Sequence, residues 1–330
     1  MISKIPYANP RNGLILNFYE EGASIVASDA SGEQFIVRDG ILRVSYEKNY
    51  ADSFGFQWQS FCATQIDSLN NSKCSEQRLL AETKWIPEVL TNLHILEVGC
   101  GAGRFTDILL RKTEAHIYSI DYSSAVEVAR ENNKFFRNRL SVAQASILEI
   151  PFPKNSFDKV LCLGVLQHTA SVEQSIRALV KQAKLNGEIV VDFYQLRGWY
   201  TWIHAKYLFR LITPRIPPNL LLKLIRSNIG WLLMVFDTLC LLNLGVLTRL
   251  LPIADLRGLP EGINREQRIE WAILDTFDAL SPVYDKPQRI SKIASYFRAN
   301  GCEITFSGVV DLVGSRAAVV RAKKIAYLQD

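Results

Sequence analysis

The chain has 330 residues and lacks the cysteine patterns of a metal centre or a disulfide framework. Its six cysteines are scattered, and none belongs to a C-x-x-C pair. We therefore expect reduced thiols, a cytoplasmic location and no zinc. The N-terminus also lacks a basic stretch followed by an apolar run, so we expect no secretory signal.

The chain also lacks the low hydrophobic content and high charge that are typical of disordered proteins. Hydrophobic residues make up 48% and charged residues 22% of the sequence, which is typical of a globular protein. The length allows one large domain or two smaller ones. The formal net charge of +5 is mild and becomes informative only when it is located along the chain.

A dinucleotide-binding fingerprint is missing from the one glycine-rich loop that stands out. Residues 95–106 read I-L-E-V-G-C-G-A-G-R-F-T, with glycines at alternate positions. This pattern predicts a strand, a loop and a helix N-terminus, where a ligand can lie against backbone amides. The fingerprint G-x-G-x-x-G would need a glycine at Arg104. The loop therefore disfavours a pyrophosphate cofactor and a dehydrogenase, and Glu97 suits a ligand with a positive charge.

From residue 94 onward, strand-like and helix-like stretches alternate. We expect strands at 94–98, 116–120, 141–145, 157–163 and 187–193, and helices at 104–112, 123–135 and 172–184. Such alternation predicts a parallel sheet that is covered on both faces and binds ligands beyond the carboxyl ends of its strands. Asp121, at the end of the second strand, can accept hydrogen bonds from two ribose hydroxyls, cap the next helix, or do both.

The two ends of the chain add further strands. Residues 1–48 read as a small β-rich module with a hairpin turn at Asp39-Gly40. The aromatic stretch that follows, 49–61, is either core or a lid over the glycine loop. After Asp285 we expect a helix at 288–299 and an antiparallel hairpin formed by 303–309 and 316–321.

Residues 199–283 interrupt the alternation with a long, apolar and helical insertion. Between 199 and 258, seven basic residues face two acids, so this segment carries the whole basic excess. Residues 227–248 contain a single charge, Asp237, yet a span would put the two flanks on opposite sides of a membrane. The insertion either covers a substrate pocket or docks on an anionic membrane surface.

Several motifs, taken together, resemble the class I S-adenosylmethionine-dependent methyltransferases. They are the glycine loop, Asp121, Q-A-S-I-L-E-I-P-F-P-K-N-S-F-D-K-V-L-C-L-G-V-L-Q-H at 144–168 and L-N-G-E-I-V-V-D at 185–192. The resemblance implies an α/β, Rossmann-like fold with a mostly parallel seven-stranded sheet and an antiparallel last hairpin. The core would comprise 49–198 and 284–330, with 199–283 as the substrate cover.

The family implies roles for matching positions. Glu97 would order the loop and the ammonium end of S-adenosylmethionine, Asp121 the ribose, and Tyr122 the adenine. Ser146 stands where the family usually has an Asp for the adenine amino group. The full set of expected cofactor residues is Glu97, Gly99, Cys100, Gly101, Gly103, Asp121, Tyr122, Ser146, Ile147 and Gly164.

The acceptor side rests on fewer residues. Methyl transfer depends mainly on in-line positioning, and a hydroxyl acceptor also benefits from a base. His168, just past the fourth core strand, is either that base or a structural histidine. Further candidates for the acceptor pocket are Trp58, Tyr194, His204, Asp275, Asp278, Tyr284 and Asp285.

A narrower resemblance is to bacterial methyltransferases of envelope-glycan and natural-product pathways. Their small N-terminal module often binds zinc; here F-I-V-R-D-G-I-L-R-V matches its end, but the metal cysteines are missing. We therefore expect a small or lipid-linked acceptor, with peripheral contact at the inner membrane face through 199–258 as one option. The alternatives are a non-catalytic binding protein and a nucleic-acid methyltransferase, for which no basic groove interleaved with aromatics is evident.

Overall fold

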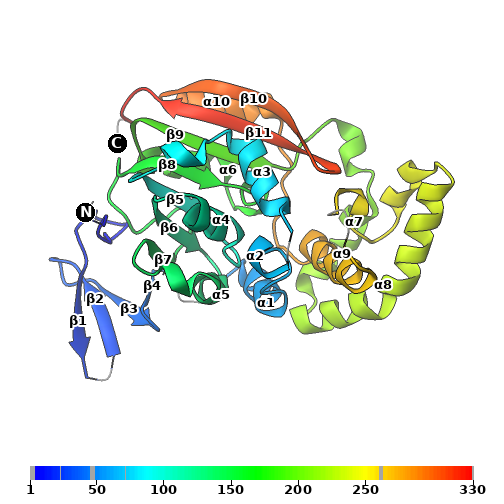
Figure 1. Cartoon of the computed structure of the whole chain (residues 1–330), viewed down its shortest axis with the longest axis horizontal. Coiled ribbons are helices and arrows are strands. Elements are labelled where there is room, and N and C mark those ends of the chain that lie inside the picture. The colour runs from blue at the N-terminus through cyan, green and yellow to red at the C-terminus, as the bar shows by residue number, and fades with distance from the viewer. Residues whose placement is uncertain (1–3, 23, 45–48, 71, 260–262, 329–330) are drawn as a thin grey trace.

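The fold is built on one mixed sheet of eleven strands, and the computed structural model describes residues 4–22, 24–44, 49–70, 72–259 and 263–328. The strand order is β1-β2-β3-β4-β7-β6-β5-β8-β9-β11-β10 (Figure 1). The strands are β1 (Asn17–Glu21), β2 (Ser24–Ser28), β3 (Gln34–Arg38), β4 (Ile41–Arg43), β5 (His94–Val98), β6 (His116–Asp121), β7 (Leu140–Gln144), β8 (Phe157–Cys162), β9 (Ala183–Phe193), β10 (Cys302–Leu312) and β11 (Ser315–Lys324).

The seven strands expected for the core lie together, with β5 to β9 parallel and β10 and β11 antiparallel at the edge. The sheet is larger than the predicted seven strands because the N-terminal strands join it. Strand β4 pairs in parallel with β7, through Leu42 with Ala143 and Arg43 with Gln144. The buried Arg43 guanidinium also donates to the Gln144 side chain at 2.8 Å. The β-rich module thus extends the core sheet.

The turn that was predicted at Asp39-Gly40 connects β3 and β4. Both residues have positive φ, 52° and 67°. Two consecutive positive φ values match the twist of an antiparallel hairpin, and Asp-Gly tolerates them at low cost.

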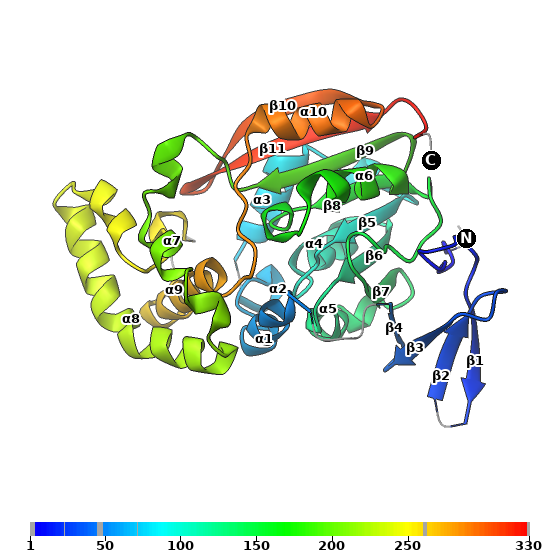
Figure 2. The same cartoon turned by 180° about the vertical axis from the view of Figure 1, so that it is seen from behind.

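Helices cover both faces of the sheet. Those of the core are α1 (Asp52–Ser60), α2 (Asp67–Asn70), α3 (Cys74–Thr83), α4 (Arg104–Lys112), α5 (Ala125–Asn132), α6 (Val172–Gln182) and α10 (Ile290–Ala299). Alternate residues of β5 enter two different cores: Leu96 packs with α6 and α10, whereas Ile95 packs with α3, α4 and α5. Figure 1 shows the second set in front of the sheet, and Figure 2 the first.

The insertion has a core of its own. It contains α7 (Ala205–Phe209), α8 (Pro218–Leu241) and α9 (Arg265–Leu280), together with single 3₁₀ turns. A capping box between Asn264 and Gln267 starts α9. Apolar residues of α8 and α9 pack around Phe61, which follows α1. In Figures 1 and 2 the insertion lies at the end of the molecule opposite the N-terminal strands.

Candidate active site

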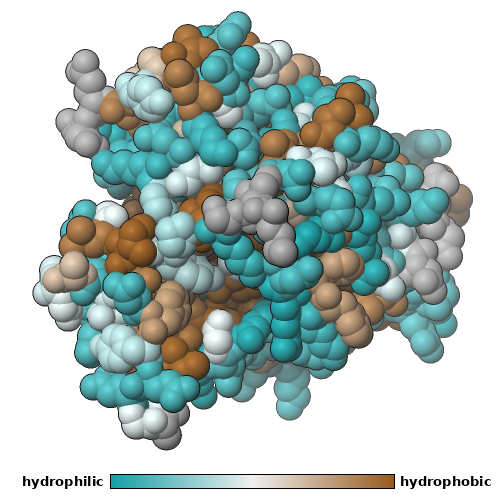
Figure 3. Space-filling view, turned by 60° about the vertical axis from the view of Figure 1, so that its left-hand side comes forward, coloured by the Kyte–Doolittle hydropathy of each residue, from teal (hydrophilic) through white to brown (hydrophobic). Residues whose placement is uncertain are grey.

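A cavity of about 890 Å³ lies beyond the carboxyl ends of β5, β6, β7, β8 and β9. Its walls also include residues of α1, α3 and the insertion. Figure 3 shows one face of the molecule, where hydrophobic patches gather beside a hollow in a largely hydrophilic surface. The cavity is therefore placed where open α/β sheets bind ligands.

The glycine loop between β5 and α4 forms the floor of this cavity. Gly99 and Gly101 have φ values of 78° and 53°. A Cβ on Gly99 would lie 2.2 Å from Val165 Cγ2, and a Cβ on Gly101 would lie 2.8 Å from Trp58 Nε1. The loop therefore has room for bare backbone only, and its surface is available to a ligand as peptide groups.

Asp121 fixes the loop from the neighbouring strand. The Gly101 amide donates to Asp121 Oδ2 at 2.9 Å, while Oδ1 accepts from the Ser123 amide at 2.9 Å. The side chain thus caps the turn before α5 and also lines the cavity. Burial raises the pKa of Asp121 above its usual value, and these hydrogen bonds oppose that rise. Oδ1 also accepts from the Ser123 hydroxyl at 2.7 Å, so Oδ2, with one partner, is the oxygen that retains acceptor capacity for a ligand hydroxyl.

Glu97 lies beneath the loop and is not among the residues that line the cavity. Its Oε2 accepts a hydrogen bond from the Thr106 hydroxyl at the start of α4, and its buried Oε1 has no partner among the described residues. Burial raises the pKa of Glu97 to about 7. The structure therefore places Glu97 where it orders the loop, and it does not bring this carboxyl to the expected ammonium position.

Two other expected cofactor residues, Gly103 and Ser146, also do not line the cavity. A Cβ on Gly103 would lie 2.6 Å from Asn133 Nδ2, so this glycine allows α4 to approach α5. The Ser146 hydroxyl accepts from the Leu148 amide at 3.2 Å and closes a local turn. The remaining seven expected cofactor residues line the cavity: Gly99, Cys100, Gly101, Asp121, Tyr122, Ile147 and Gly164.

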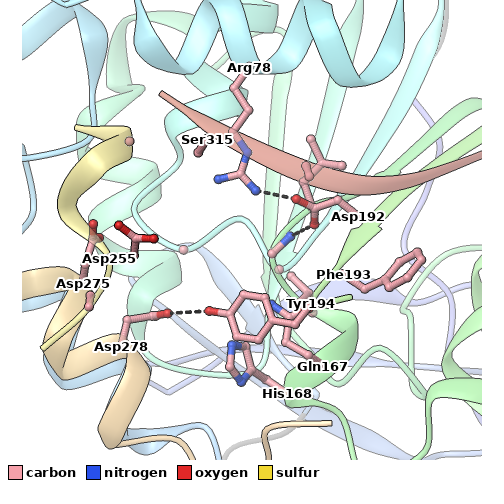
Figure 4. A pocket seen from close by; sticks show the side chains of 18 of the residues that line it. Arg78, Gln167, His168, Asp192, Phe193, Tyr194, Asp255, Asp275, Asp278 and Ser315 are labelled. Carbon is pink, nitrogen blue, oxygen red and sulfur yellow. Dashed lines mark hydrogen bonds and ion pairs between the residues drawn. The ribbon is translucent and has the colours of Figure 1, made fainter. Parts of the chain in front are cut away.

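Arg78 and Asp192 form a charged wall that motif reading did not find. Arg78 of α3 donates to Asp192 Oδ2 at 2.5 Å and to Glu82 Oε1 at 2.9 Å. Asp192 Oδ1 in turn accepts from the Gly164 amide. Figure 4 shows Arg78 and Asp192 facing each other. This chain of contacts ties α3 and β9 to the loop after β8, and so fixes the position of Gly164.

His168 lies in the 3₁₀ helix η3 (Leu166–His168) and lines the cavity. Its Nδ1 is 2.8 Å from the carbonyl oxygen of Tyr284. Because a carbonyl can only accept, Nδ1 carries the proton and Nε2 keeps a lone pair. Burial lowers the pKa of His168, so the ring is neutral at neutral pH. The ring packs between Phe54 and Tyr194 at centroid distances of 5.1 and 5.6 Å.

Carboxylates from the insertion stand opposite His168 in the same cavity. Asp278 accepts from the Tyr194 hydroxyl at 3.3 Å and from Gln57 Nε2 at 3.1 Å. Asp275 also lines the cavity, and burial, then the charge of Asp278, raise its pKa to about 7. Figure 4 shows Asp275 and Asp278 on the insertion side, across from the core residues. Core and insertion therefore share one pocket.

Of four further candidates for the acceptor pocket, two line the cavity and two do not. Trp58 lines the cavity above the glycine loop, and His204 lines it with a pKa that burial lowers to about 4. The structure does not bring Tyr284 or Asp285 into the lining. Tyr284 packs edge-on to Tyr50 at 5.0 Å, and Asp285 pairs with Lys206 Nζ at 2.8 Å.

The aromatic stretch 49–61 takes both of the roles considered for it. Tyr50, Phe54 and Trp58 line the cavity, whereas Phe56 and Phe61 pack in the core of the insertion. Tyr50 also packs against Tyr122, with ring centroids 5.1 Å apart. This segment therefore joins the cofactor side of the pocket to the insertion.

Comparison with known families decides the class of this domain. Residues 96–191, which run from β5 to β9, match the model of the family described as "Methyltransferase domain". The matched segment contains the glycine loop, Asp121 and His168. The chain carries a class I S-adenosylmethionine-dependent methyltransferase domain.

Relatives of this methyltransferase domain have diverse acceptors. A "Ubiquinone biosynthesis O-methyltransferase" of Rickettsia akari is 32% identical over 107 residues, which are 31% of this chain and 41% of that protein. A "tRNA U34 carboxymethyltransferase" of Nautilia profundicola is 27% identical over 110 residues, which are 33% of this chain and 37% of that protein. The chain thus spans about two fifths of the length of these relatives.

Solved structures give weaker matches. The magnesium protoporphyrin IX methyltransferase of Synechocystis PCC 6803, solved with S-adenosylhomocysteine, has a TM-score of 0.45 and 14% identity, over 83% of this chain and 96% of that one. Within the described ranges of the methyltransferase chain, no group of three or more His, Cys, Asp or Glu side chains could hold a metal ion.

Proposed function

We propose that the protein transfers a methyl group from S-adenosylmethionine to a hydroxyl of a small or lipid-linked acceptor. The observation that carries this proposal is the single cavity in which the glycine loop and Asp121 face His168 and the insertion. The donor residues come from the methyltransferase domain, and the acceptor residues come from both parts of the chain. Such acceptors fit the biosynthesis of a natural product or an envelope glycan.

The residues present fit the cofactor. A loop that admits only backbone can pass under the methionine and ribose, and Asp121 Oδ2 keeps acceptor capacity for a ribose hydroxyl. Carboxylates on several sides of the cavity suit a ligand with a positive charge. When bound, S-adenosylmethionine supplies a methyl group on a sulfonium that needs no further activation.

The chain itself has three tasks in this reaction. Tyr194, Asp278 and Gln57 form a hydrogen-bonded group that can orient the acceptor. His168 Nε2 takes the proton of the acceptor hydroxyl as its oxygen becomes the nucleophile, and later releases that proton to solvent. The aromatic residues of α1 and the insertion limit the entry of water. The products are a methyl ether and S-adenosylhomocysteine.

Nucleic acid is a weaker candidate for the acceptor, although one relative is named for its action on tRNA. The acceptor side of the cavity carries Asp255, Asp275 and Asp278. These acids alternate with Lys206, Arg249 and Arg257, so the wall is of mixed charge and is not the continuous basic surface that a phosphate backbone binds. The six cysteines are free thiols, which supports a reducing, cytoplasmic location.

Two measurements test the proposal. Calorimetry with S-adenosylmethionine should show binding to the wild-type protein; no binding at millimolar cofactor would overturn the proposal. Incubation with methyl-labelled cofactor and a cell extract should then label a small or lipid-extractable product. Label that enters only RNA would assign the protein to the nucleic-acid methyltransferases, and binding without any labelled product would favour a non-catalytic protein.

A further inference from the structure

Helix α8 is apolar on two opposite faces. One face, which includes Leu222, Ile229 and Phe236, is buried in the core of the insertion. The opposite face repeats at spacings of three and four residues, is exposed, and consists of Leu220, Leu224, Ser227, Trp231, Met234, Thr238 and Leu241. Trp231 is 51% and Met234 69% exposed. Packing within the chain accounts for the first face only.

The exposed apolar surface continues beyond α8. About half of the exposed large hydrophobic side chains in the described residues lie within 199–250. After α8 they include Leu242, Val246 and Leu250, and before it Trp199, Trp202, Leu208, Leu211 and Ile212. Arg249 donates to the Tyr200 carbonyl at 2.9 Å and joins these two stretches. We call residues 199–250 with this exposed apolar set the apolar rim.

Basic residues flank the exposed face of α8. Lys223 and Arg226 are exposed, and neither forms an ion pair with any residue in the described ranges. The acid on α8, Asp237, is paired with Arg268. The apolar rim therefore presents hydrophobic side chains next to uncompensated positive charge, and it lies on the outer edge of the insertion in Figures 1 and 2.

We propose that the apolar rim docks in the plane of an anionic lipid bilayer. Exposed tryptophans and leucines would enter the interface, while Lys223 and Arg226 contact acidic headgroups. The rim shares residues with the cavity wall: Tyr200, Thr201 and His204 on one side, and Thr248 and Arg249 on the other. Docking would therefore place the cavity at the membrane surface, and this part rests on the proposed function with a lipid-linked acceptor.

Two other occupants of the apolar rim fit less well. Among the described helices, α8 alone is long and apolar enough to cross a membrane, by length and composition. A span would strip its buried face from α9 and expose the core of the insertion. A second copy of the chain, packed with its α8 parallel about a two-fold axis, would bring Lys223 and Arg226 of both copies together. Lipid satisfies both the apolar face and the charge.

Flotation with liposomes tests the docking. The wild-type protein should float with phosphatidylcholine vesicles that contain about one third phosphatidylglycerol, and less so at high salt. The double variant W231E/M234E should lose flotation by tenfold or more, and K223E/R226E should lose most of its dependence on acidic lipid. Phe135→Glu is the matched control. Phe135 is also an exposed aromatic residue, at 82%, but it lies on the surface of the methyltransferase domain, outside the apolar rim.

Other results of the flotation experiment would contradict docking of the apolar rim. Wild-type protein that stays with the unbound fraction at low salt overturns docking, as does flotation of W231E/M234E at the wild-type level. If the protein stays with the vesicles during alkaline extraction, α8 spans the bilayer and the docking proposal is wrong. If the wild-type protein does not float but forms a dimer that W231E/M234E disrupts, the rim is a self-association surface instead. Calorimetry with S-adenosylmethionine on the same samples tests the proposed function independently of docking. A protein that binds the cofactor but does not float disproves the docking alone.

Discussion

The methyltransferase core and the insertion bury their apolar residues in different ways. In the core, each central strand sends alternate residues into two cores, so the strands are covered on both faces. In the insertion, α8 buries one apolar face and exposes a second, largely apolar one. The core is thus complete within the chain, whereas the insertion presents a surface to something outside it.

The same contrast divides the pocket. The core supplies the glycine loop, Asp121 and His168, and their positions follow from the ends of parallel strands. The insertion supplies Asp275 and Asp278, which lie on a helix and face the core. This difference suggests that the core determines donor binding and proton transfer, and that the insertion determines which acceptor is used.

The strongest test of that division is His168→Gln in the core. Loss of the proton acceptor at Nε2 should lower kcat by about 100- to 10,000-fold. The affinity for S-adenosylmethionine should stay within about twofold, because His168 makes its polar contact with the Tyr284 carbonyl. Initial rates and calorimetry measure the two effects. His116→Gln, at the opposite end of the sheet, should change neither; an active H168Q protein would leave His168 a structural residue.

Gly99→Ala should mainly weaken donor binding. The new Cβ would meet Val165 Cγ2 at 2.2 Å, in a residue with a φ of 78°. Overpacking of this kind costs about 1–3 kcal/mol, which corresponds to about 10- to 100-fold weaker binding if the loop shifts. Calorimetry with S-adenosylmethionine measures this change in affinity. Gly13→Ala is matched in φ, at 79°, but has open space around its Cβ.

A second variant separates the clash at Gly99 from backbone strain. Val165→Ala in the Gly99→Ala background removes the methyl groups that the new Cβ would meet. We expect this pair to recover part of the lost affinity. If G99A binds the cofactor as well as G13A does, the close approach of backbone and side chain at this loop is not needed for donor binding.

Asp278→Asn tests the insertion. The amide can still accept from Tyr194 or donate to a neighbour, but the charge shared by Tyr194 and Gln57 is lost. Since charged hydrogen bonds exceed neutral ones by about 1 kcal/mol, the acceptor KM should rise about fivefold, with unchanged cofactor affinity. Asp237→Asn, an insertion carboxylate paired with Arg268, is the control. A change in cofactor affinity for D278N would contradict the division of roles.

The sequence predicts the core well because its signals are local. Strand, loop and helix follow one another from Ile95 to Lys112, and Asp121 stands one βα unit later. The pairs that complete the site are distant in sequence: Arg78 with Asp192, and His168 with Tyr284. No motif spacing connects such residues. Only Glu82, four residues after Arg78, hints at an ion pair on that helix.

Two further contacts depend on distant partners. Asp67 accepts from the amides of Ser75 and Glu76 at the start of α3. Strand β4, in the β-rich module, pairs with β7 about 100 residues away. In each case the partner is brought in by tertiary packing, and nothing in the nearby sequence identifies that partner.

The smallest expected effect concerns Glu97, which is buried in the core beneath the loop. Burial raises its pKa from 4.5 to about 7. Between these values the folded protein retains a proton that the unfolded chain has lost, so the stabilisation is present below pH 4.5 and disappears as the pH rises through 7. Glu97→Gln cannot titrate, and its melting temperature should therefore fall less than that of the wild type between pH 5 and pH 8.

The comparison needs a control because other buried acids titrate in the same direction. Burial also raises the pKa values of Glu82 and Asp275 to about 7, so Glu97→Gln should remove only part of the pH dependence. Glu114→Gln makes the same change at a side chain that is 71% exposed and should leave the wild-type slope intact. Equal slopes for E97Q and E114Q would mean that Glu97 is ionised in the folded core, with a cation or water satisfying its second oxygen.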